Sequence, residues 1–345
     1  MAVQLFNGDN GGMKKIKPPR CDVALLVDEE TGKYAESGRF IPESDDVEEK
    51  VVRALRKNYS RVEVVPFSPK VVETIQWLRQ LRPKIVFNLT EWVKGDRKLD
   101  AAITGLLDVL RFRYTGTGPD GLRLARDKAL SKQIVAEFGV PVPRYFVADG
   151  PRELRGHDLG FPLIVKPLFG DGSDEVNKHS VVRNEKQLRA RVSALRRRLG
   201  EPAVCEEFIP GNDLYVGLLG NEPRVLTPVE LVVRSTHRSA PQFATYRLKN
   251  DPRYRARWGA HYRRARLSPA QMRRVREVSR RIFQALKLRD YARLDFRLTP
   301  EGAIYFIEAN PNPDLDPYAL NRSGCFAGVP YANLVRAIVE SARGR

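Results

Sequence analysis

Cysteine and histidine are scarce in this 345-residue sequence, and neither residue type is clustered. The three cysteines, Cys21, Cys205 and Cys325, stand far apart, so the sequence predicts neither a disulfide framework nor a zinc site. The four histidines form no close cluster, and we assign them no role. No apolar run is long enough to cross a bilayer, and the first ten residues lack the basic start and apolar core of a signal peptide. We therefore expect a cytoplasmic protein with no membrane partner.

Acidic residues are fewer than basic ones. The sequence has 60 lysines and arginines and 42 aspartates and glutamates, which gives a formal net charge of +18. Such an excess raises the question of a nucleic-acid partner. Much of it lies in two arginine-rich stretches, 189–198 and 253–281, and neither carries a zinc-finger or RNA-binding signature. Arginine-rich helices are more commonly solvated faces. We therefore expect no nucleic-acid partner, whereas an anionic small molecule such as ATP is compatible with the charge.

The sequence also lacks a Gly-x-Gly-x-x-Gly turn, which excludes the dinucleotide-binding fingerprint. Apolar runs nevertheless predict strands at 21–27, 61–67 and 84–89, and apolar periodicity predicts helices at 45–59, 71–81 and 101–110. Asp45 and Asp46 are expected to cap the first of these helices. The β-α-β-α-β-α alternation predicts a Rossmann-like layer, a parallel sheet with helices on its faces.

A turn-rich break at 115–121 marks the first predicted domain boundary. After it we expect a long helix at 122–138, strands at 163–166, 203–209, 214–219 and 225–233, and helices at 185–199, 268–286 and 329–342, with Ser268 as a cap. The predicted organisation is a flexible lead at 1–20, a Rossmann-like domain at 21–120, a central domain at 121–205 and a C-terminal domain at 206–345.

A predicted hairpin, 291–298 and 303–309 around a turn at 299–302, is the most informative feature. If Arg293 lies opposite Glu308 and Asp295 opposite Phe306, alternation places four polar side chains on one face: Arg293, Asp295, Glu308 and Asn310. Asp295 and Glu308 would then be diagonal neighbours about 7–8 Å apart. Oxygen ligands at this spacing suit Mg²⁺. A solvated sheet edge is the open alternative, and a one-residue slip in register would undo the pattern.

Three lysines stand where phosphates could be bound. Lys166 ends an apolar strand and is followed by a glycine-rich turn, 170–173, that contains Gly172 and Ser173. An ammonium group beside backbone amides that glycine leaves accessible suits a triphosphate. Lys128 lies on the helix after the boundary, and Lys249 lies in a polar segment that we expect to be a loop. Considered alone, each of these features is also compatible with an ordinary turn or a solvated charge.

The segment 204–213 has the composition of a nucleoside site. Glu206 precedes an apolar pair, Phe208 and Ile209, and a Pro-Gly turn then leads to Asp213. A purine needs apolar walls with a backbone donor and acceptor at its edge, and a ribose needs a carboxylate for its hydroxyls. An inter-domain hinge without a ligand is the alternative.

Taken in order, these segments, together with Val86–Leu89, Tyr114–Gly118 and Asp127-Lys128, resemble the ATP-grasp superfamily and within it the D-alanine–D-alanine ligases. The resemblance implies an ATP-grasp fold, α/β and α+β, behind the N-terminal layer. It implies an ATP site made of Lys128, Lys166, Gly172, Ser173, Glu206, Phe208, Ile209, Asp213 and Lys249. It also implies that Asp295, Glu308 and Asn310 hold Mg²⁺, with Mn²⁺ as a substitute, and that Arg293 and Lys249 act in catalysis. The implied reaction is an ADP-forming ligation of a carboxylate to an amine through an acyl phosphate.

The substrate half of the sequence departs from the family pattern. The family has a Gly-Gly turn and a glutamate near its start, a tyrosine after the loop lysine, and a Ser-Pro-Gly turn after the metal asparagine. This chain has instead DEETGKYAESGRF at 28–40, Asn250, and PNPDLDP at 311–317. Asp314 and Asp316 are candidate acceptor-recognition residues, because carboxylates there would attract a cationic amine. A turn cap and a solvent-facing carboxylate are the open alternative.

The expected partners are therefore a small-molecule carboxylate and a small-molecule amine, with D-alanine in doubt and a homodimer left open. Two other functions remain compatible with the sequence. One is a D-alanine–D-alanine ligase proper. The other is a non-catalytic nucleotide sensor or RNA-binding adaptor, against which the Asp295–Glu308 pair argues, because ATP binding alone has less need of a full magnesium site.

Overall fold

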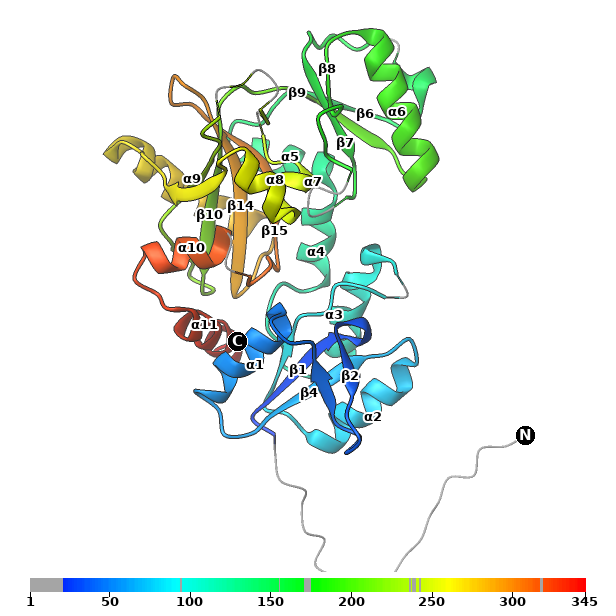
Figure 1. The fold of residues 1–345 in the computed structure, drawn as a ribbon, viewed down its shortest axis with the longest axis vertical. Coiled ribbons are helices and arrows are strands. Elements are labelled where there is room, and N and C mark those ends of the chain that lie inside the picture. The colour runs from blue at the N-terminus through cyan, green and yellow to red at the C-terminus, as the bar shows by residue number, and fades with distance from the viewer. Residues whose placement is uncertain are drawn as a thin grey trace, which may run out of the picture.

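The computed structural model describes residues 21–93, 95–154, 156–170, 175–235, 237, 240–241, 243–316 and 319–345. Three larger sheets with their helices, and one two-stranded sheet, make up the described part of an elongated molecule (Figure 1). The predicted lead at 1–20 lies outside the described residues. Among the described helices, none combines the length and the apolar character needed to span a bilayer.

The first sheet is the predicted Rossmann-like layer, parallel and ordered β4-β1-β5. Its strands are β1 (Val23–Asp28), β4 (Val62–Phe67) and β5 (Ile85–Asn88), and its helices are α1 (Val47–Arg56), α2 (Val71–Leu81) and α3 (Asp100–Val109). A small hairpin of β2 (Gly32–Tyr34) and β3 (Phe40–Pro42) follows β1. Every residue of β1 is buried, as expected of a central parallel strand covered on both faces.

The predicted cap of α1 is not made. Asp46 occupies the position before the helix, but its side chain accepts no capping hydrogen bond. Asp45 adopts a left-handed backbone conformation with φ of 68° and stands outside the helix. Glu48 and Glu49, in the first turn, supply the negative charge that the positive end of the helix dipole favours.

The second sheet is antiparallel, ordered β6-β9-β7-β8, and α6 covers one of its faces (Figure 1). Its strands are β6 (Tyr145–Ala148), β7 (Leu163–Pro167), β8 (Val181–Val182) and β9 (Ala203–Glu207), and α6 is Glu185–Leu199. The apolar stripe of α6 faces the core and consists of Leu188, Val192 and Leu195. Arg196, Arg197 and Arg198 are exposed.

The third sheet is antiparallel and ordered β13-β12-β10-β14-β15, with β11 paired to β10. Its strands are β10 (Asn212–Leu219), β11 (Arg224–Val225), β12 (Val229–Val232), β13 (His261–Arg264), β14 (Tyr291–Leu298) and β15 (Ile304–Asn310). Helix α9 (Pro269–Ala285) packs on one face of this sheet, and α10 (Ala319–Phe326) packs on the other. The single strand predicted at 225–233 is thus divided between β11 and β12.

The long helix predicted at 122–138 is two helices, α4 (Pro119–Arg126) and α5 (Lys128–Glu137). The break is at Asp127, whose backbone is extended and whose carboxylate accepts hydrogen bonds from the amides of Ala129 and Leu130. Because aspartate is a strong N-cap, it starts a new helix where the periodicity alone suggested continuity. Both helices pack against β15, although their residues belong to the predicted central domain.

The predicted β14–β15 register is wrong. Arg293 lies opposite Asn310, and Asp295 lies directly opposite Glu308. A β-bulge between the Asp295–Glu308 and Phe296–Phe306 pairs places Ile307 as an extra residue in β15. The extra residue interrupts the alternation along β15, so that Glu308 shares a face of the sheet with its partner Asp295. Asp295 and Glu308 are therefore direct cross-strand partners, whereas the sequence predicted diagonal neighbours.

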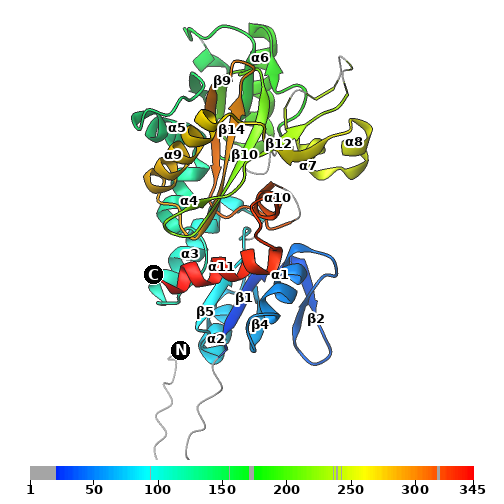
Figure 2. The same cartoon turned by 90° about the vertical axis from the view of Figure 1, so that its left-hand side faces the viewer.

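The last helix, α11 (Tyr331–Arg343), returns to the first sheet (Figure 2). Its buried residues Leu334, Val335, Ile338 and Val339 share one core with β1, β4, β5 and α1. The end of the chain thus packs against its beginning, although its residues lie within the segment predicted as a C-terminal domain. Arg345 extends this contact, because its side chain donates to the carbonyl oxygen of Tyr114 and pairs with the buried Asp290.

The capping box of α9 leads to a prediction about stability. The Ser268 side chain accepts from the amide of Gln271, whose side chain in turn accepts from the amide of Ser268. We expect Ser268→Ala to lower the free energy of unfolding by about 1 kcal/mol, whereas Ser268→Gly costs only a few tenths of that. Urea unfolding of the three proteins tests this order. Equal losses for both variants would show that the cap does not contribute as proposed.

Candidate active site

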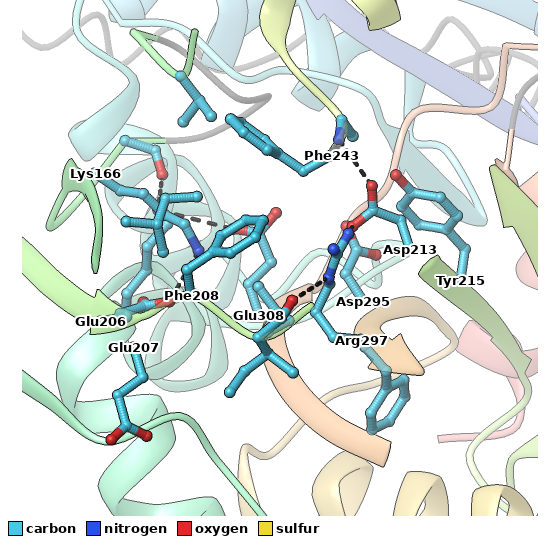
Figure 3. Close-up of a pocket in the computed structure, with 18 of the residues that line it drawn as sticks. Lys166, Glu206, Glu207, Phe208, Asp213, Tyr215, Phe243, Asp295, Arg297 and Glu308 are labelled. Carbon is cyan, nitrogen blue, oxygen red and sulfur yellow. Dashed lines mark hydrogen bonds and ion pairs between the residues drawn. The ribbon is translucent and has the colours of Figure 1, made fainter. Parts of the chain in front are cut away.

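A cleft between the second and third sheets collects most of the predicted ATP-site residues (Figure 3). We call it the inter-sheet cleft, and the predicted residues that line it are Lys128, Lys166, Glu206, Phe208, Ile209, Asp213, Lys249, Asp295 and Glu308. A second, adjoining cleft opens toward the first sheet and shares Lys128, Lys249 and Glu308 with it. Arg293, Asn310 and Asp314 line this adjoining cleft. Gly172 and Ser173 lie outside the described residues.

Glu206 is fully buried and lies between two lysines. Its carboxylate is 2.8 Å from Lys132 and 2.9 Å from Lys166. Burial by itself would raise the pKa of Glu206, but the two ammonium groups outweigh burial and lower the pKa to about 2. Its carboxylate is therefore committed to the lysines, and its backbone lies within β9, which is paired with β6 on one side and β7 on the other.

Lys132 is the residue of this group that the sequence analysis missed. Its side chain is completely buried and donates to the carbonyl oxygen of Ile307, 2.8 Å away, next to Glu308. Burial lowers the pKa of Lys132, Lys166 and Lys128 add to this, and Glu206 opposes it. We infer that Lys132 stays charged, because the ionised Glu206 is within ion-pair distance. The spacing from Lys128 to Lys132, one turn of α5, is the signal that could have revealed it.

The carboxylate pair on the hairpin is unevenly neutralised. Asp295 makes a two-point ion pair with Arg293, with N–O distances of 2.7 and 3.1 Å. Glu308 lies 4.0 Å from Lys128. Burial would raise the pKa of Glu308, but Lys128, Lys249 and Lys166 lower it to about 2. Burial raises the pKa of Asp295, with Arg293 opposing and Glu308 reinforcing the rise.

These residues fit a divalent cation. Two carboxylates face each other on adjacent strands, and the side-chain nitrogen of Asn310 is buried without a hydrogen-bond partner. An amide with an unsatisfied atom can turn its oxygen toward a cation, because its two orientations are interchangeable in shape. Among the described residues, no three His, Cys, Asp or Glu side chains form a metal cluster. An ion here therefore needs ligands beyond the two carboxylates, which matches the habit of Mg²⁺.

Aromatic and aliphatic side chains form the other end of the inter-sheet cleft. Phe208 packs edge-on against Phe243, with ring centroids 6.0 Å apart (Figure 3). Arg297, which the sequence analysis also missed, lies over the Phe208 ring and pairs with Asp213 at 2.8 Å. The second oxygen of Asp213 accepts from the amide of Ala244, 2.7 Å away. Asp213 is thus already engaged on both oxygens, and a ribose hydroxyl would have to share or displace one of these contacts.

Lys249 lies on a short helix, α7 (Tyr246–Asn250), rather than in the predicted loop. Thr245 caps this helix by accepting from the amide of Leu248. The next helix, α8 (Pro252–Arg257), begins directly after it. Lys249 lines both clefts, although its local structure differs from the prediction. The side chain of Asn250 lies outside the described residues.

The two aspartates after Asn310 differ in their surroundings. Asp316 pairs with Lys50 at 3.1 Å, so its charge is neutralised by a residue of α1. Asp314 accepts from the amide of Asp316, which is the turn-capping contact considered as an alternative. Asp314 makes no ion pair with a described residue and lines the adjoining cleft. Of the two, Asp314 is the one whose charge remains available to a ligand.

Comparison with known proteins adds independent information. The family model described as D-ala D-ala ligase C-terminus matches residues 134–340. A D-alanine–D-alanine ligase of Rhodospirillum rubrum is 30% identical over 291 residues, covering 84% of this chain and 90% of that protein. The uncharacterized protein y4sG of Sinorhizobium fredii is 29% identical over 267 residues, covering 76% of this chain and 75% of that protein.

Solved structures show the same fold. The D-alanine–D-alanine ligase of Bacillus anthracis complexed with ATP superposes with a TM-score of 0.68 at 19% identity, covering 94% of this chain and 97% of that one. The VanG D-Ala:D-Ser ligase of Enterococcus faecalis gives the same TM-score at 16% identity, covering 94% of this chain and all of that one. At these identities the likeness establishes the ATP-grasp fold.

The Glu206 contacts predict energetic coupling. We expect Lys132→Met to lower the free energy of unfolding by roughly 3 kcal/mol, because it leaves a buried carboxylate with one partner fewer. Adding Glu206→Gln should recover at least about 1 kcal/mol of that loss, because the uncompensated charge is then gone. Urea unfolding of the two single variants and the double variant measures this coupling.

Lys84→Met is the matched control, because Lys84 forms an exposed ion pair with Asp22 at 2.8 Å. An exposed pair is worth at most about 1 kcal/mol, so this variant should unfold almost like the wild type. Strict additivity of the Lys132 and Glu206 losses would contradict the proposed ion-pair cluster.

Proposed function

The chain belongs to the D-alanine–D-alanine ligase family of ATP-dependent, ADP-forming carboxylate–amine ligases, and from this premise we propose that its acceptor is a cationic amine and not D-alanine. The observation that carries the proposal is the carboxylate of Asp314, which borders the adjoining cleft without an ion-pair partner among the described residues. A negative charge beside the acceptor position attracts a cation and repels a second carboxylate. D-Alanine as acceptor would bring that carboxylate.

The family uses ATP and a divalent metal, and the proposed ligands in this chain are Asp295, Glu308 and Asn310, with Mg²⁺ as the proposed ion. Bound there, the ion would neutralise charge on the ATP phosphates. The protein's own cations would complete that neutralisation: Lys128, Lys166 and Lys249 all contribute to lowering the pKa of Glu308, so their charges converge on one region. Fixed charges of this kind supply most of the catalysis in phosphoryl transfer.

The proposed reaction has two steps. A carboxylate oxygen of the first substrate attacks the γ-phosphorus of ATP, the bond to the bridging oxygen breaks, and ADP leaves. The nitrogen of the amine then attacks the acyl carbon, inorganic phosphate leaves, and the nitrogen loses a proton to give the amide. Arg293 is proposed to stabilise the oxyanion. Its pairing with Asp295 fixes the guanidinium and leaves one terminal nitrogen without a hydrogen bond to a described residue.

The nucleoside of ATP is proposed to occupy the other end of the inter-sheet cleft. Phe208 and Ile209 supply apolar walls there, and Phe243 adds a second ring that the sequence had not indicated. Glu206 is proposed to contribute to this site by holding Lys166 in position with its side chain. Asp213 is proposed to accept from a ribose hydroxyl once its contact with the amide of Ala244 is released.

The metal assignment leads to a direct test. We expect Asp295→Asn or Glu308→Gln to reduce ADP release by at least about 100-fold, because the ion and the phosphate charge lose a fixed partner in a buried site. Coupled-enzyme measurement of ADP under saturating magnesium checks this, with circular dichroism to show that the variants are folded.

Glu301→Gln is the matched control, because Glu301 is exposed in the turn of the same hairpin. Its turnover should equal that of the wild type. Wild-type turnover by Asp295→Asn or Glu308→Gln would exclude these residues as metal ligands.

A D-alanine–D-alanine ligase proper is the second candidate, favoured by the R. rubrum relative. The two candidates are separated by measuring ADP release with a panel of amino acids and amines. We expect cationic amines to be better acceptors than D-alanine, and Asp314→Asn to raise their KM about fivefold, the loss of one nearby charge interaction. Asp316→Asn should change KM less, because Lys50 already neutralises Asp316. Efficient D-alanine ligation that is unchanged in Asp314→Asn would favour the second candidate.

A further inference from the structure

The ammonium group of Lys132 lines neither cleft, yet it is completely buried among polar groups. The carbonyl oxygen of Ile307 and a carboxylate oxygen of Glu206 are each 2.8 Å away, and the carbonyl oxygen of Lys128 is 3.4 Å away. Because an ammonium group has three hydrogens to donate, these three contacts use its full capacity. Lys132 therefore acts on the fold and not on a substrate directly.

Each of the three contacts adjoins a residue proposed for the ATP or metal site. Ile307 directly precedes Glu308 in β15. Glu206 holds Lys166 through an ion pair of 2.9 Å. Lys128 is itself proposed to neutralise the phosphates, and its ammonium group lies 4.0 Å from Glu308. One buried side chain thus connects a group proposed to bind the metal ion with groups proposed to bind the phosphates.

The contact with Ile307 falls on the β-bulge of β15. Among the described strands, β15 is at the edge of the third sheet and pairs with β14 alone. The amide of Phe306 donates to the carbonyl oxygen of Pro141, 2.8 Å away, and the carbonyl of Ile307 accepts from Lys132, so both groups point away from β14. In a regular strand, the amide of one residue and the carbonyl of the next point to opposite edges. The bulge therefore needs a donor outside the sheet, and Lys132 supplies it.

The bulge decides which face of the sheet Glu308 occupies. Beyond the bulge, Glu308 lies directly opposite Asp295. Without it, the pairing beside the turn, in which Phe296 lies opposite Phe306, would continue and place Ile307 opposite Asp295. Cross-strand partners share a face of the sheet, so Glu308 would then lie on the other face. The second carboxylate of the proposed metal site thus depends on the bulge.

We propose that Lys132 is a positioning residue for the metal site, because its bond to the Ile307 carbonyl maintains the bulge that places Glu308 opposite Asp295. The proposal deepens the proposed function and rests on it, since it takes these two carboxylates as the metal ligands. Through Glu206, the same ammonium group also fixes the distance between this site and Lys166. Lys132 would thus hold the metal ligands and the phosphate-binding lysine in one arrangement without contacting either substrate.

A purely structural role, in which Lys132 only neutralises the buried Glu206, makes a different prediction. Loss of that role would destabilise the protein and weaken nucleotide binding equally with and without a metal ion. Loss of the positioning role would weaken the part of nucleotide binding that the metal ion adds. The two roles are separated by the magnesium ratio, which we define as the Kd for a nucleotide in EDTA divided by its Kd in saturating magnesium.

Isothermal titration calorimetry of the full-length protein with AMPPNP, a non-hydrolysable analogue of ATP, measures this ratio without any turnover. We expect the magnesium ratio of the wild-type protein to be well above one. Lys132→Met should lower it at least tenfold, because Glu308 no longer faces Asp295. Methionine keeps an unbranched, flexible side chain at this buried position, so the variant removes the donors with little loss of packing.

Glu206→Gln separates the two contacts of Lys132, because it removes the ion pair and leaves the bond to the Ile307 carbonyl. It should weaken AMPPNP binding in both conditions and keep the magnesium ratio within twofold of the wild-type value. The double variant Lys132→Met with Glu206→Gln should recover stability relative to Lys132→Met, since no buried charge is left with a partner missing. Its magnesium ratio should stay as low as that of Lys132→Met.

Leu334→Ala is the matched control for lost stability. Leu334 is buried in the core that α11 shares with the first sheet, and it lines neither cleft. Truncating a buried leucine lowers the free energy of unfolding. The magnesium ratio of this variant should nevertheless remain within twofold of the wild-type value.

Three results would overturn the positioning role: a wild-type ratio in Lys132→Met, a ratio that recovers with stability in the double variant, or an equal fall in Leu334→Ala. Asp295→Asn distinguishes these results from failure of the proposed metal site. If Asp295→Asn brings the ratio close to one and Lys132→Met does not change it, the metal site stands and the positioning role is lost. A wild-type ratio of about one would overturn the metal assignment together with the positioning role.

Discussion

The ion-pair cluster around Glu206 is the interaction on which the geometry of the active site depends. It joins β9 to β7 through Lys166 and to α5 through Lys132, and Lys132 also reaches the carbonyl of Ile307 in the third sheet. A buried carboxylate is unfavourable unless its charge is matched, so these contacts have to form together. The cluster joins both antiparallel sheets. Its contacts therefore also fix the separation between the two walls of the inter-sheet cleft.

Charge is sorted within this protein in a way that the net value conceals. The inter-sheet cleft is lined by three lysines and one arginine together with five acidic residues, whereas the cavity at the end of β1 is lined by acidic residues and by no described lysine or arginine. The two spaces are connected through the adjoining cleft. ATP would meet the lysines of the first space, and the proposed cationic amine would meet the carboxylates of the second. The excess arginines lie largely on solvated faces such as that of α6.

The hairpin illustrates how much of the site local sequence could predict. Alternation along β14 correctly places Arg293 and Asp295 together, and they form an ion pair. The register failed in two steps: the pairs beside the turn are already displaced by one residue, since Phe296 lies opposite Phe306, and the bulge at Ile307 displaces the following pairs by one more. The second step depends on contacts across the fold. Here the carbonyl of Ile307 is bound by Lys132, a residue 175 positions earlier in the chain. The prediction of one helix at 122–138 failed for a local reason. It followed the apolar periodicity, whereas in the structure the N-cap at Asp127 starts a second helix.

The sequence by itself determined most of the longer strands and helices, the family, and the identity of most polar residues around the clefts, because periodicity, caps and motif order are short-range properties of the chain. Only the tertiary structure decided which charges are available. It buried Lys132 against Glu206, paired Asp316 with Lys50, and left Asp314 and Asp28 facing a common chamber. These outcomes depend on distances between residues that are remote in the sequence. The energy of a charge is set by what surrounds it in space, and no pattern of neighbouring residues contains that information.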